Sequence, residues 1–285
     1  PPHSCHMIAL ALKKKFNLPW VSDFRDPWTN IDFYDNLHLS SYADKQHRKK
    51  EKEVLTTADV VVSVGKTLCE ELKALGAKKT VLITNGYDSL QEADVLDKEF
   101  SLLHIGRLGK SRNPEVLWKV LSEMCKEDES FLQSCKVNLV GNVDGEVKES
   151  IKKNGLENIV EFVDNVSNVA SLDMQKSSQL LLLLINDTPN AKGILTGKFF
   201  EYLSTRRPIV CIGPKDGDAA EMLKNSGAGE TFSFADKKEL KLHLIEQFAR
   251  YKDGVLKLET TNISAYSREC SAKKYTALLN ELVNA

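Results

Sequence analysis

The chain has 285 residues, of which 42% are hydrophobic and 28% charged, a composition typical of a globular protein with one large domain or two of ordinary size. Its net charge is −1, from 39 basic and 40 acidic residues, so no overall field would hold nucleic acid or an anionic membrane. An anionic ligand would therefore need a local cluster of cations. No apolar run reaches about eighteen residues, which argues against a membrane-spanning helix.

The six cysteines are scattered and form no C-x-x-C pair, which favours reduced thiols over a disulfide framework or a zinc site. The chain opens with Pro1-Pro2-His3 and lacks the charged and apolar regions of a signal peptide. We therefore expect the sequence to begin inside a longer protein.

Strands alternate with amphipathic helices nearly throughout, which is the pattern of a parallel sheet covered by helices. The first expected elements are helix 7–16, strand 19–24, helix 40–57, strand 59–64, helix 66–75 and strand 80–84. A turn at Asn85-Gly86-Tyr87-Asp88 and an acidic linker over 91–99 follow.

A second series of elements begins after the linker. It comprises strand 101–105, helix 114–126, strand 136–140, helix 145–153, strand 159–163, helix 166–175, strand 180–185, helix 197–204, strand 208–212, helices 218–226 and 237–251, and a closing helix 263–283. The sequence thus predicts an α/β protein of two sequential units. We expect a partial N-terminal domain over 1–95, a second domain over 96–262 and a C-terminal helix over 263–285.

Open parallel sheets bind ligands at the carboxyl ends of their strands, so the loops after strands are candidate sites. The loop after strand 101–105 runs from Gly106 to Pro114 and carries Arg107, Lys110 and Arg112. Its glycines let a ligand approach the backbone, and the next helix begins with free N–H groups. A diphosphate site and a solvated basic turn both fit this loop, and both remain open.

A second loop, over 186–198, follows the most apolar strand and leads into a helix near Thr196 and Gly197. It supplies Lys192 and Lys198. Because a cation in a first helical turn is disfavoured by the helix dipole, a bound anion would explain Lys198. An ordinary long loop is the alternative, although long ordered loops in compact domains are often functional.

Glu201 follows Lys198 on the same expected helix. A carboxylate there would repel a phosphate but is suited to accept hydrogen bonds from ribose hydroxyls. The alternative is a structural residue paired with Arg206 or Arg207. No G-x-G-x-x-G follows a strand, which weighs against NAD.

Three further patterns imitate functional motifs. Gly65-Lys66-Thr67 resembles the end of a Walker A loop, but Val60 occupies the required glycine position. Asp216-Gly217-Asp218 resembles a metal-binding D-x-D, although a helix start explains it better. His3 and His6 have no evident third metal ligand nearby, so we expect loose N-terminal histidines.

Several segments are distinctive as a set: 19–28 (PWVSDFRDPW), 58–63 (ADVVVS), 83–88 (ITNGYD), Gly106-Arg107, 196–203 (TGKFFEYL) and Arg207-Pro208-Ile209. In order and spacing they closely resemble the group-1 (family four) retaining glycosyltransferases of the GT-B fold, over nearly the whole chain. The resemblance implies two Rossmann-like domains facing across a cleft, with the donor held mainly by the second. It also implies that the closing helix crosses back to the first domain.

The resemblance assigns roles to individual residues. Gly106, Arg107, Lys110 or Arg112, and Lys198 with Thr196 and Gly197 would meet the donor diphosphate, and Glu201 would bind its ribose. Arg107, Arg112 and Lys198 are the expected catalytic residues, with no metal and no separate cofactor. Asp23, Arg25 and Asp26 would face the acceptor, with a salt-bridged turn as the alternative.

Two departures from the family pattern limit what the resemblance implies. The partner of Glu201 in the family's paired-glutamate motif should lie at position 193, where this chain has Gly193. The identity of the donor sugar is therefore left open. The family's first domain is also longer than the stretch before the linker, so we expect its early strands to precede Pro1, which leaves open whether this chain alone is active.

The function implied is hexose transfer from a UDP- or GDP-type sugar to a glycan or lipid-linked acceptor, in the synthesis of surface polysaccharide or another glycan. A cytoplasmic enzyme is expected, with no nucleic-acid partner and with peripheral contact to the inner membrane face through the part before Pro1. A nucleotide-sugar epimerase of the same fold and a non-catalytic nucleotide-binding scaffold are the rival hypotheses.

Overall fold

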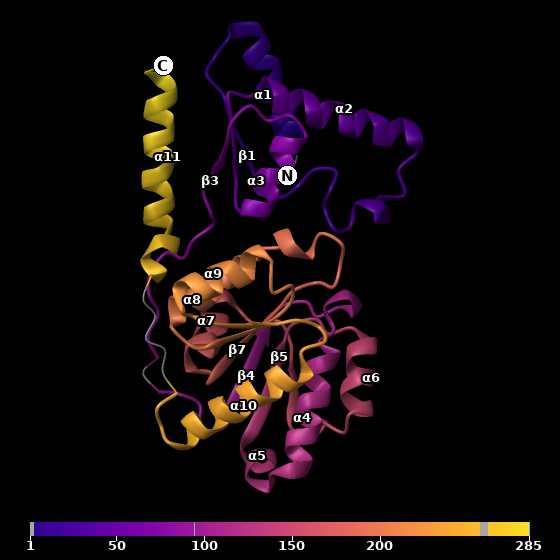
Figure 1. The fold of residues 1–285 in the computed structure, drawn as a ribbon, viewed down its shortest axis with the longest axis vertical. Coiled ribbons are helices and arrows are strands. Elements are labelled where there is room, and N and C mark those ends of the chain that lie inside the picture. Colours follow the sequence, from indigo (N-terminus) through magenta and orange to yellow (C-terminus); the bar gives the residue numbers. More distant parts are fainter. Residues whose placement is uncertain (1–2, 94, 257–261, 285) are drawn as a thin grey trace. The chain divides into compact units, whose positions relative to one another are not determined.

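The computed structural model describes residues 3–93, 95–256 and 262–284 and divides into two compact units (Figure 1). The first unit comprises Pro1–Asp88, Lys192–Leu195 and Ser264–Ala285, and the second comprises Ser89–Ala191 and Thr196–Ile263. None of the helices in the described ranges is both long and apolar enough to cross a membrane.

The first unit contains a three-stranded parallel sheet in the order β1-β2-β3. Its strands are β1 (Val21–Phe24), β2 (Val60–Ser63) and β3 (Thr80–Leu82). Its helices are α1 (Ser4–Phe16), α2 (Ser41–Thr57), α3 (Lys66–Ala74) and α11 (Arg268–Val283), with short 3-10 turns at η1 (Tyr34–Leu37) and η4 (Ile263–Tyr266).

The alternation of side chains along β2 separates two apolar clusters in the first unit. Val61 packs in a cluster with Val54 and Leu55 of α2 and with residues of α1 and α3. Val60 and Val62 belong to a different cluster, which includes Leu278 of α11. The C-terminal helix α11 therefore contributes to the core of the first unit. Figure 1 shows this helix beside β3.

Two expectations for the first unit are wrong. The helix predicted over 263–283 is interrupted, because Ser267 caps α11: its Oγ accepts a hydrogen bond from the Cys270 N–H at 3.2 Å. The N-terminal histidines are not loose. His3 stacks on Trp28 with ring centroids 4.5 Å apart, and His6 stacks on Phe24 at 4.4 Å. Burial lowers the pKa of His3 to about 4, so it packs as a neutral ring.

The second unit is built on a six-stranded parallel sheet in the order β6-β5-β4-β7-β8-β9. The strands are β4 (Phe100–Ile105), β5 (Cys135–Val140), β6 (Val160–Val163), β7 (Leu180–Leu184), β8 (Ile209–Ile212) and β9 (Gly229–Phe232). The helices are α4 (Glu115–Glu127), α5 (Glu129–Ser134), α6 (Gly145–Lys153), α7 (Asn168–Ser177), α8 (Gly197–Thr205), α9 (Asp218–Ser226) and α10 (Lys237–Lys252), with a 3-10 turn at η2 (Lys110–Arg112). The 3-10 turn η3 (Ala191–Gly193) has its first residue in the second unit and its other two in the first.

The strand order of the second unit reverses direction between β4 and β7. Right-handed crossovers on either side of such a reversal place helices on both faces of the sheet, as Figure 1 shows. The expected fold class, α/β with a complete parallel sheet in the second unit, is confirmed. The reversal also marks the strand ends at which open sheets bind ligands.

Two elements of the second unit were not predicted. The edge strand β9 is only four residues long, and just one of them, Phe232, is buried. Its apolar pattern is therefore too weak to predict a strand. Helix α5 is a single short segment capped by Asp128, whose carboxylate accepts from the N–H groups of Ser130 and Phe131. Neither element was predicted, because neither has a full period of apolar residues.

The stretch expected to be a linker contains no helix or strand at its described residues. It is nevertheless bound to the second unit. The N–H of Gln91 donates to the carbonyl of Ser204 at 2.9 Å, and that of Asp97 donates to Ser177 at 2.8 Å. Gln91 and Asp97 of this segment are therefore attached to the second unit.

Candidate functional site

The two central strands of the second unit separate at their carboxyl ends. Strand β4 pairs with β5 along its whole length, but with β7 only at Leu102 and Leu103. Beyond that point side chains replace the backbone ladder. His104 Nδ1 lies 3.1 Å from the Leu182 carbonyl, and the Ile105 N–H donates to the Tyr202 hydroxyl at 3.2 Å. The two strands therefore separate where the strand order reverses, and the Leu182 carbonyl and the Ile105 N–H still have hydrogen-bond partners there.

His104 is held neutral in this opening. It is 3% exposed, and burial lowers its pKa to about 3, with the charges of Lys198 and Arg112 acting in the same direction. A neutral ring next to a carbonyl carries its proton on Nδ1, which donates to Leu182. Nε2 is buried and has no hydrogen-bond partner among the residues described.

The two predicted loops meet at Gly106. This glycine follows β4 and has a φ of +118°, a conformation that favours glycine. A Cβ at this position would lie 1.9 Å from Lys198 Nζ, so the ammonium group rests directly against the glycine backbone. Gly106 therefore admits the close approach of the Lys198 side chain.

Lys198 lies in the first turn of α8, and no acid among the described residues lies within ion-pair distance of its ammonium group. Within the described ranges it forms no hydrogen bond or ion pair. Its pKa is lowered, first by burial and then by the positive charge of Arg112, with Glu201 opposing. Two cations held together at a helix N-terminus create a local positive potential in a protein whose net charge is only −1.

Arg112 is fixed by the end of the neighbouring strand. Its Nε donates to Asn186 Oδ1 at 2.6 Å, and Asn186 is 9% exposed just beyond β7. Its Nη1 also reaches the Arg107 carbonyl at 3.4 Å. The guanidinium is therefore oriented by the loops that follow β4 and β7.

A cavity of about 750 Å³ lies beside this arginine. It is lined by Arg107, Gly109, Lys110, Ser111, Arg112, Asn113, Asp144, Asn186 and Asp187. Arg107 and Lys110 are largely exposed, and each faces an acid: Arg107 Nη2 lies 3.7 Å from Asp144, and Lys110 Nζ lies 3.1 Å from Glu146. These two cations are solvated and partly neutralised, in contrast to Lys198.

The start of α8 offers further groups to an anion. Thr196 is the N-cap residue, but its side chain makes no capping hydrogen bond. Its Oγ1 is buried and lacks a partner in the described part of the chain. Gly197 is exposed and has no side chain that could cover the backbone there. The first turn of this helix can therefore donate both a hydroxyl and N–H groups.

Glu201 is exposed on α8, and its Oε2 accepts from Gln175 Nε2 at 3.2 Å. The basic residues suggested as its structural partners bind elsewhere. Arg206 lies 3.9 Å from Glu92, and Arg207 donates to the carbonyls of Ser178 and Gln179. The carboxylate thus keeps one oxygen for a ligand, since no described residue donates to Oε1.

The three residues expected at the acceptor side lie in the first unit. Arg25 donates to Asp23 at 3.0 Å and to the Tyr275 hydroxyl at 2.7 Å, and Tyr275 donates to Asp23 at 2.7 Å. This triad joins β1 to α11, which matches the alternative of a salt-bridged turn. Asp26 is exposed beside it.

Sequence reasoning missed three residues of the site: His104, Asn186 and Tyr202. A histidine within an otherwise apolar strand was the available signal for His104, because a buried polar group must find a partner. Tyr202 lay within a motif already noted, but only the structure shows it accepting from β4. No cluster of three or more His, Cys, Asp or Glu side chains able to hold a metal occurs among the described residues.

No protein-family model matches the sequence, and no curated protein sequence matches it significantly. Solved structures do match. Sucrose-phosphate synthase from Thermosynechococcus elongatus is similar over 98% of this chain and 71% of its own, with a TM-score of 0.68 and 15% identity. A glycosyltransferase from Rickettsia africae covers 98% and 81%, with a TM-score of 0.64 and 16% identity. The similarity extends to Anabaena HepE, solved with UDP-glucose, over 99% and 76%, with a TM-score of 0.62 and 15% identity.

These likenesses concern the fold. The chain has the GT-B fold of these glycosyltransferases, with two Rossmann-like α/β units, as the sequence motifs implied.

Proposed function

We propose that the protein is a retaining glycosyltransferase that uses a nucleotide-diphosphate sugar as donor. The observation that carries the proposal is the convergence of Lys198 and Arg112 beside Gly106, where the central strands separate. HepE was solved with UDP-glucose, and pneumococcal GtfA with UDP and GlcNAc. Their fold and this cluster of cations support a nucleotide diphosphate as the anion.

The chemistry follows from where charge develops. When the anomeric bond breaks, negative charge grows on the leaving diphosphate. Preplaced cations and the N-terminus of α8 stabilise that charge more in the transition state than in the bound donor. In this proposal Lys198 and Arg112 contact the diphosphate, and Arg107 and Lys110 contribute from the exposed side of the cavity. Losing either Lys198 or Arg112 would raise the barrier by about 2–4 kcal/mol, by analogy with the loss of one oxyanion donor.

Donor recognition would use the remaining groups of the same helix. Thr196 and Gly197 would donate to phosphate oxygens from the N-terminus of α8, and Glu201 would accept from the ribose hydroxyls. Gly106 would allow Lys198 Nζ to lie against the backbone, from where it would contact the diphosphate. Asp23, Arg25 and Asp26 would act on the acceptor side, with Asp23 and Arg25 positioned by Tyr275.

The biological setting is proposed by analogy. WaaG, which shares the fold with 12% identity and a TM-score of 0.62, is described as acting in lipopolysaccharide biosynthesis. We extend this to a glycan or lipid-linked acceptor in polysaccharide synthesis, in the cytoplasm or at the inner face of the membrane. The proposed reaction needs no metal, since the protein's own cations would meet the diphosphate.

The proposal is tested by incubating the full chain with radiolabelled UDP-, GDP- and ADP-sugars and a panel of glycan acceptors. We expect transfer or slow hydrolysis of one donor, with retained anomeric configuration by NMR. Loss of that turnover is expected in Lys198→Ala and Arg112→Ala but not in Lys136→Ala, whose lysine pairs with Glu161 at the start of β5. Epimerised donor would instead identify an epimerase, and binding without turnover a nucleotide-binding scaffold.

A further inference from the structure

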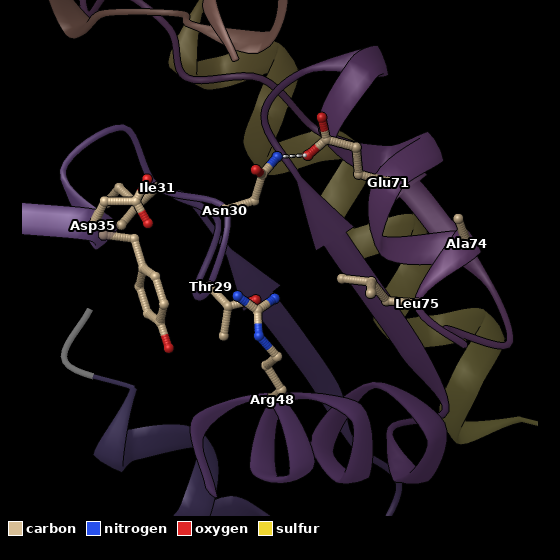
Figure 2. A pocket seen from close by; sticks show the side chains of 9 residues that line it. Thr29, Asn30, Ile31, Asp35, Arg48, Glu71, Ala74 and Leu75 are labelled. Atoms are coloured by element: carbon tan, nitrogen blue, oxygen red, sulfur yellow. Dashed lines mark hydrogen bonds between the residues drawn. The ribbon is translucent and has the colours of Figure 1, made fainter. Parts of the chain in front are cut away.

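A second cavity lies wholly within the first unit and belongs to no site described above. Its volume is about 510 Å³, within the range of about 300–1,000 Å³ usual for small-molecule sites. Its walls come from the loop after β1, from α2 and from α3 (Figure 2). The lining residues are Thr29, Asn30, Ile31, Tyr34, Asp35, Arg48, Glu71, Ala74 and Leu75.

The loop that forms one wall is anchored at both sides. Buried Glu51 of α2 accepts from the Thr29 hydroxyl at 2.6 Å and from its N–H at 3.3 Å. Asn30 Nδ2 donates to Glu71 of α3 at 2.9 Å. Since these bonds tie the loop to two helices, the cavity is preformed, and a ligand would not have to pay the entropy of ordering the loop.

Several polar groups of the cavity keep unused hydrogen-bonding capacity. Arg48 donates through Nε to both oxygens of Asp44, at 2.9 and 3.0 Å, and its guanidinium carbon lies 5.7 Å from the centroid of the Tyr34 ring. Its two terminal amino groups have no hydrogen-bond partner among the described residues. In Figure 2 the guanidinium points from α2 into the space between Thr29 and Leu75. The Asp35 carboxylate forms no hydrogen bond or ion pair within the described ranges, and the Glu71 carboxylate accepts only through Oε2.

The charges select the class of ligand. The lining carries one positive and two negative formal charges, from Arg48, Asp35 and Glu71. The positive charge is already paired with Asp44, so an anion such as phosphate would be repelled. Hydroxyl groups suit this set, because carboxylates accept from them and a guanidinium donates to them. Ile31, Ala74 and Leu75 supply the apolar surface that the C–H face of a sugar ring covers.

We propose that this cavity binds a neutral saccharide unit. It is separate from the acceptor-side residues expected from the sequence, since Asp23, Arg25 and Asp26 do not line it. That the saccharide belongs to the acceptor rests on the proposed function; that the cavity binds saccharide does not. The two are therefore tested separately.

The test is calorimetry and saturation-transfer NMR on the full chain with maltotriose, mannotriose and cellotriose. A uronic-acid trisaccharide and the diamine putrescine serve as charged competitors. We expect a neutral trisaccharide to bind. Ala74→Trp, which fills the cavity from an exposed position, should weaken it at least tenfold, and so should Glu71→Gln, which keeps the bond from Asn30 but removes the charge.

Matched controls sit next to these positions on α3. Lys73→Trp and Glu70→Gln place a tryptophan and a neutral amide outside the cavity and should leave saccharide affinity unchanged. Failure of every neutral saccharide to bind, tighter binding of the uronic acid or putrescine, or unchanged affinity in both Ala74→Trp and Glu71→Gln would overturn the proposal. UDP and GDP affinity, measured on the same samples, reports the donor site independently, so either hypothesis can fail alone.

Discussion

Glu201 distinguishes a nucleotide site from a generic anion site. A ribose diol offers two donors that one carboxylate can accept, and such charge-assisted bonds contribute about 1.5–3 kcal/mol. Glu201→Ala should therefore weaken a nucleoside diphosphate by about tenfold or more. Pyrophosphate affinity should stay the same or rise slightly, because a nearby negative charge is removed. Calorimetry with both ligands makes the comparison.

In the competing interpretation, Glu201 is a structural residue paired with Arg206 or Arg207. Both arginines bind other groups instead. Gln175 remains as a neighbour. Glu201→Gln is the matched variant that keeps the shape of the side chain. Equal loss of nucleoside diphosphate and pyrophosphate in Glu201→Ala would refute the ribose assignment.

His104 predicts a specific pH dependence of stability. Its pKa is about 3 in the folded protein and about 6.5 when unfolded, so between these values the unfolded chain binds the additional proton. The contribution of His104 is fully present above pH 6.5 and is lost as the pH falls toward 3, by up to about 1.4 kcal/mol per pH unit. Urea unfolding between pH 7.5 and 4.5 measures it.

The control for this prediction is His104→Asn, whose amide can still donate toward Leu182 but does not titrate. Its free energy of unfolding should fall less steeply below pH 6.5 than that of the natural protein. Parallel slopes for the two proteins would show that His104 is protonated in the folded state. His3, with a pKa of about 4, contributes to both slopes and cancels in the difference.

At the scale of elements, Tyr202 links α8 to the end of β4. Its hydroxyl accepts the Ile105 N–H, next to the glycine against which Lys198 rests. Tyr202→Phe would leave the N–H of the half-buried Ile105 unpaired, at a cost of up to about 1–3 kcal/mol. We expect lower stability and weaker nucleoside-diphosphate binding together, by urea unfolding and calorimetry.

Tyr42→Phe is the control, since Tyr42 is 74% exposed in the first unit and belongs to a different unit from Tyr202. Unchanged nucleotide affinity in Tyr202→Phe would show that the Gly106 loop keeps its shape without this bond. Tyr202 would then be part of the core and have no role in positioning the site.

The sequence predicted most elements because their patterns are complete. Helices α6 and α9 were expected with the bounds they have, and the all-apolar β7 was identified from its residues alone. Strand β9 was missed because its burial depends on the neighbouring β8 and not on its own pattern. The break before α11 was missed because Ser267 also fits inside a helix, and only its capping bond shows that the helix begins there.

At the candidate site, too, the sequence showed only what a residue's own segment contains. The glycines, cations and helix start were visible as sequence, and they led to Gly106, Arg112 and Lys198. The residues that hold them in place could not be recognised in the sequence, because Asn186 and Tyr202 act through contacts between segments distant in sequence. The sequence also predicted Arg107 as a catalytic residue beside Arg112, and Lys110 as an alternative to Arg112 at the diphosphate, whereas the structure pairs both with acids.

For the whole molecule, the first unit depends on the end of the chain. Leu278 of α11 packs with Val60, Val62 and Ile83 and is 5% exposed. Leu278→Ala should lower the stability of the first unit by about 2–5 kcal/mol. The second unit should keep its nucleotide affinity, because α11 lies outside it.

Differential scanning calorimetry with and without UDP measures both effects. The expected result is a transition shifted to lower temperature that UDP does not restore, beside one that UDP still stabilises. The control is Leu279→Ala, since Leu279 is 47% exposed on the same helix. Loss of UDP stabilisation in Leu278→Ala would contradict the independence of the second unit.

The central claim is that Lys198 and Arg112 together hold a nucleotide diphosphate. Isothermal calorimetry with UDP and GDP on Lys198→Ala, Arg112→Ala and the control Lys136→Ala tests it most directly. Each charge-assisted bond contributes about 1.5–3 kcal/mol, so each site variant should lose about tenfold or more in affinity, with the control unchanged. Affinity that is unchanged in both site variants would contradict the account.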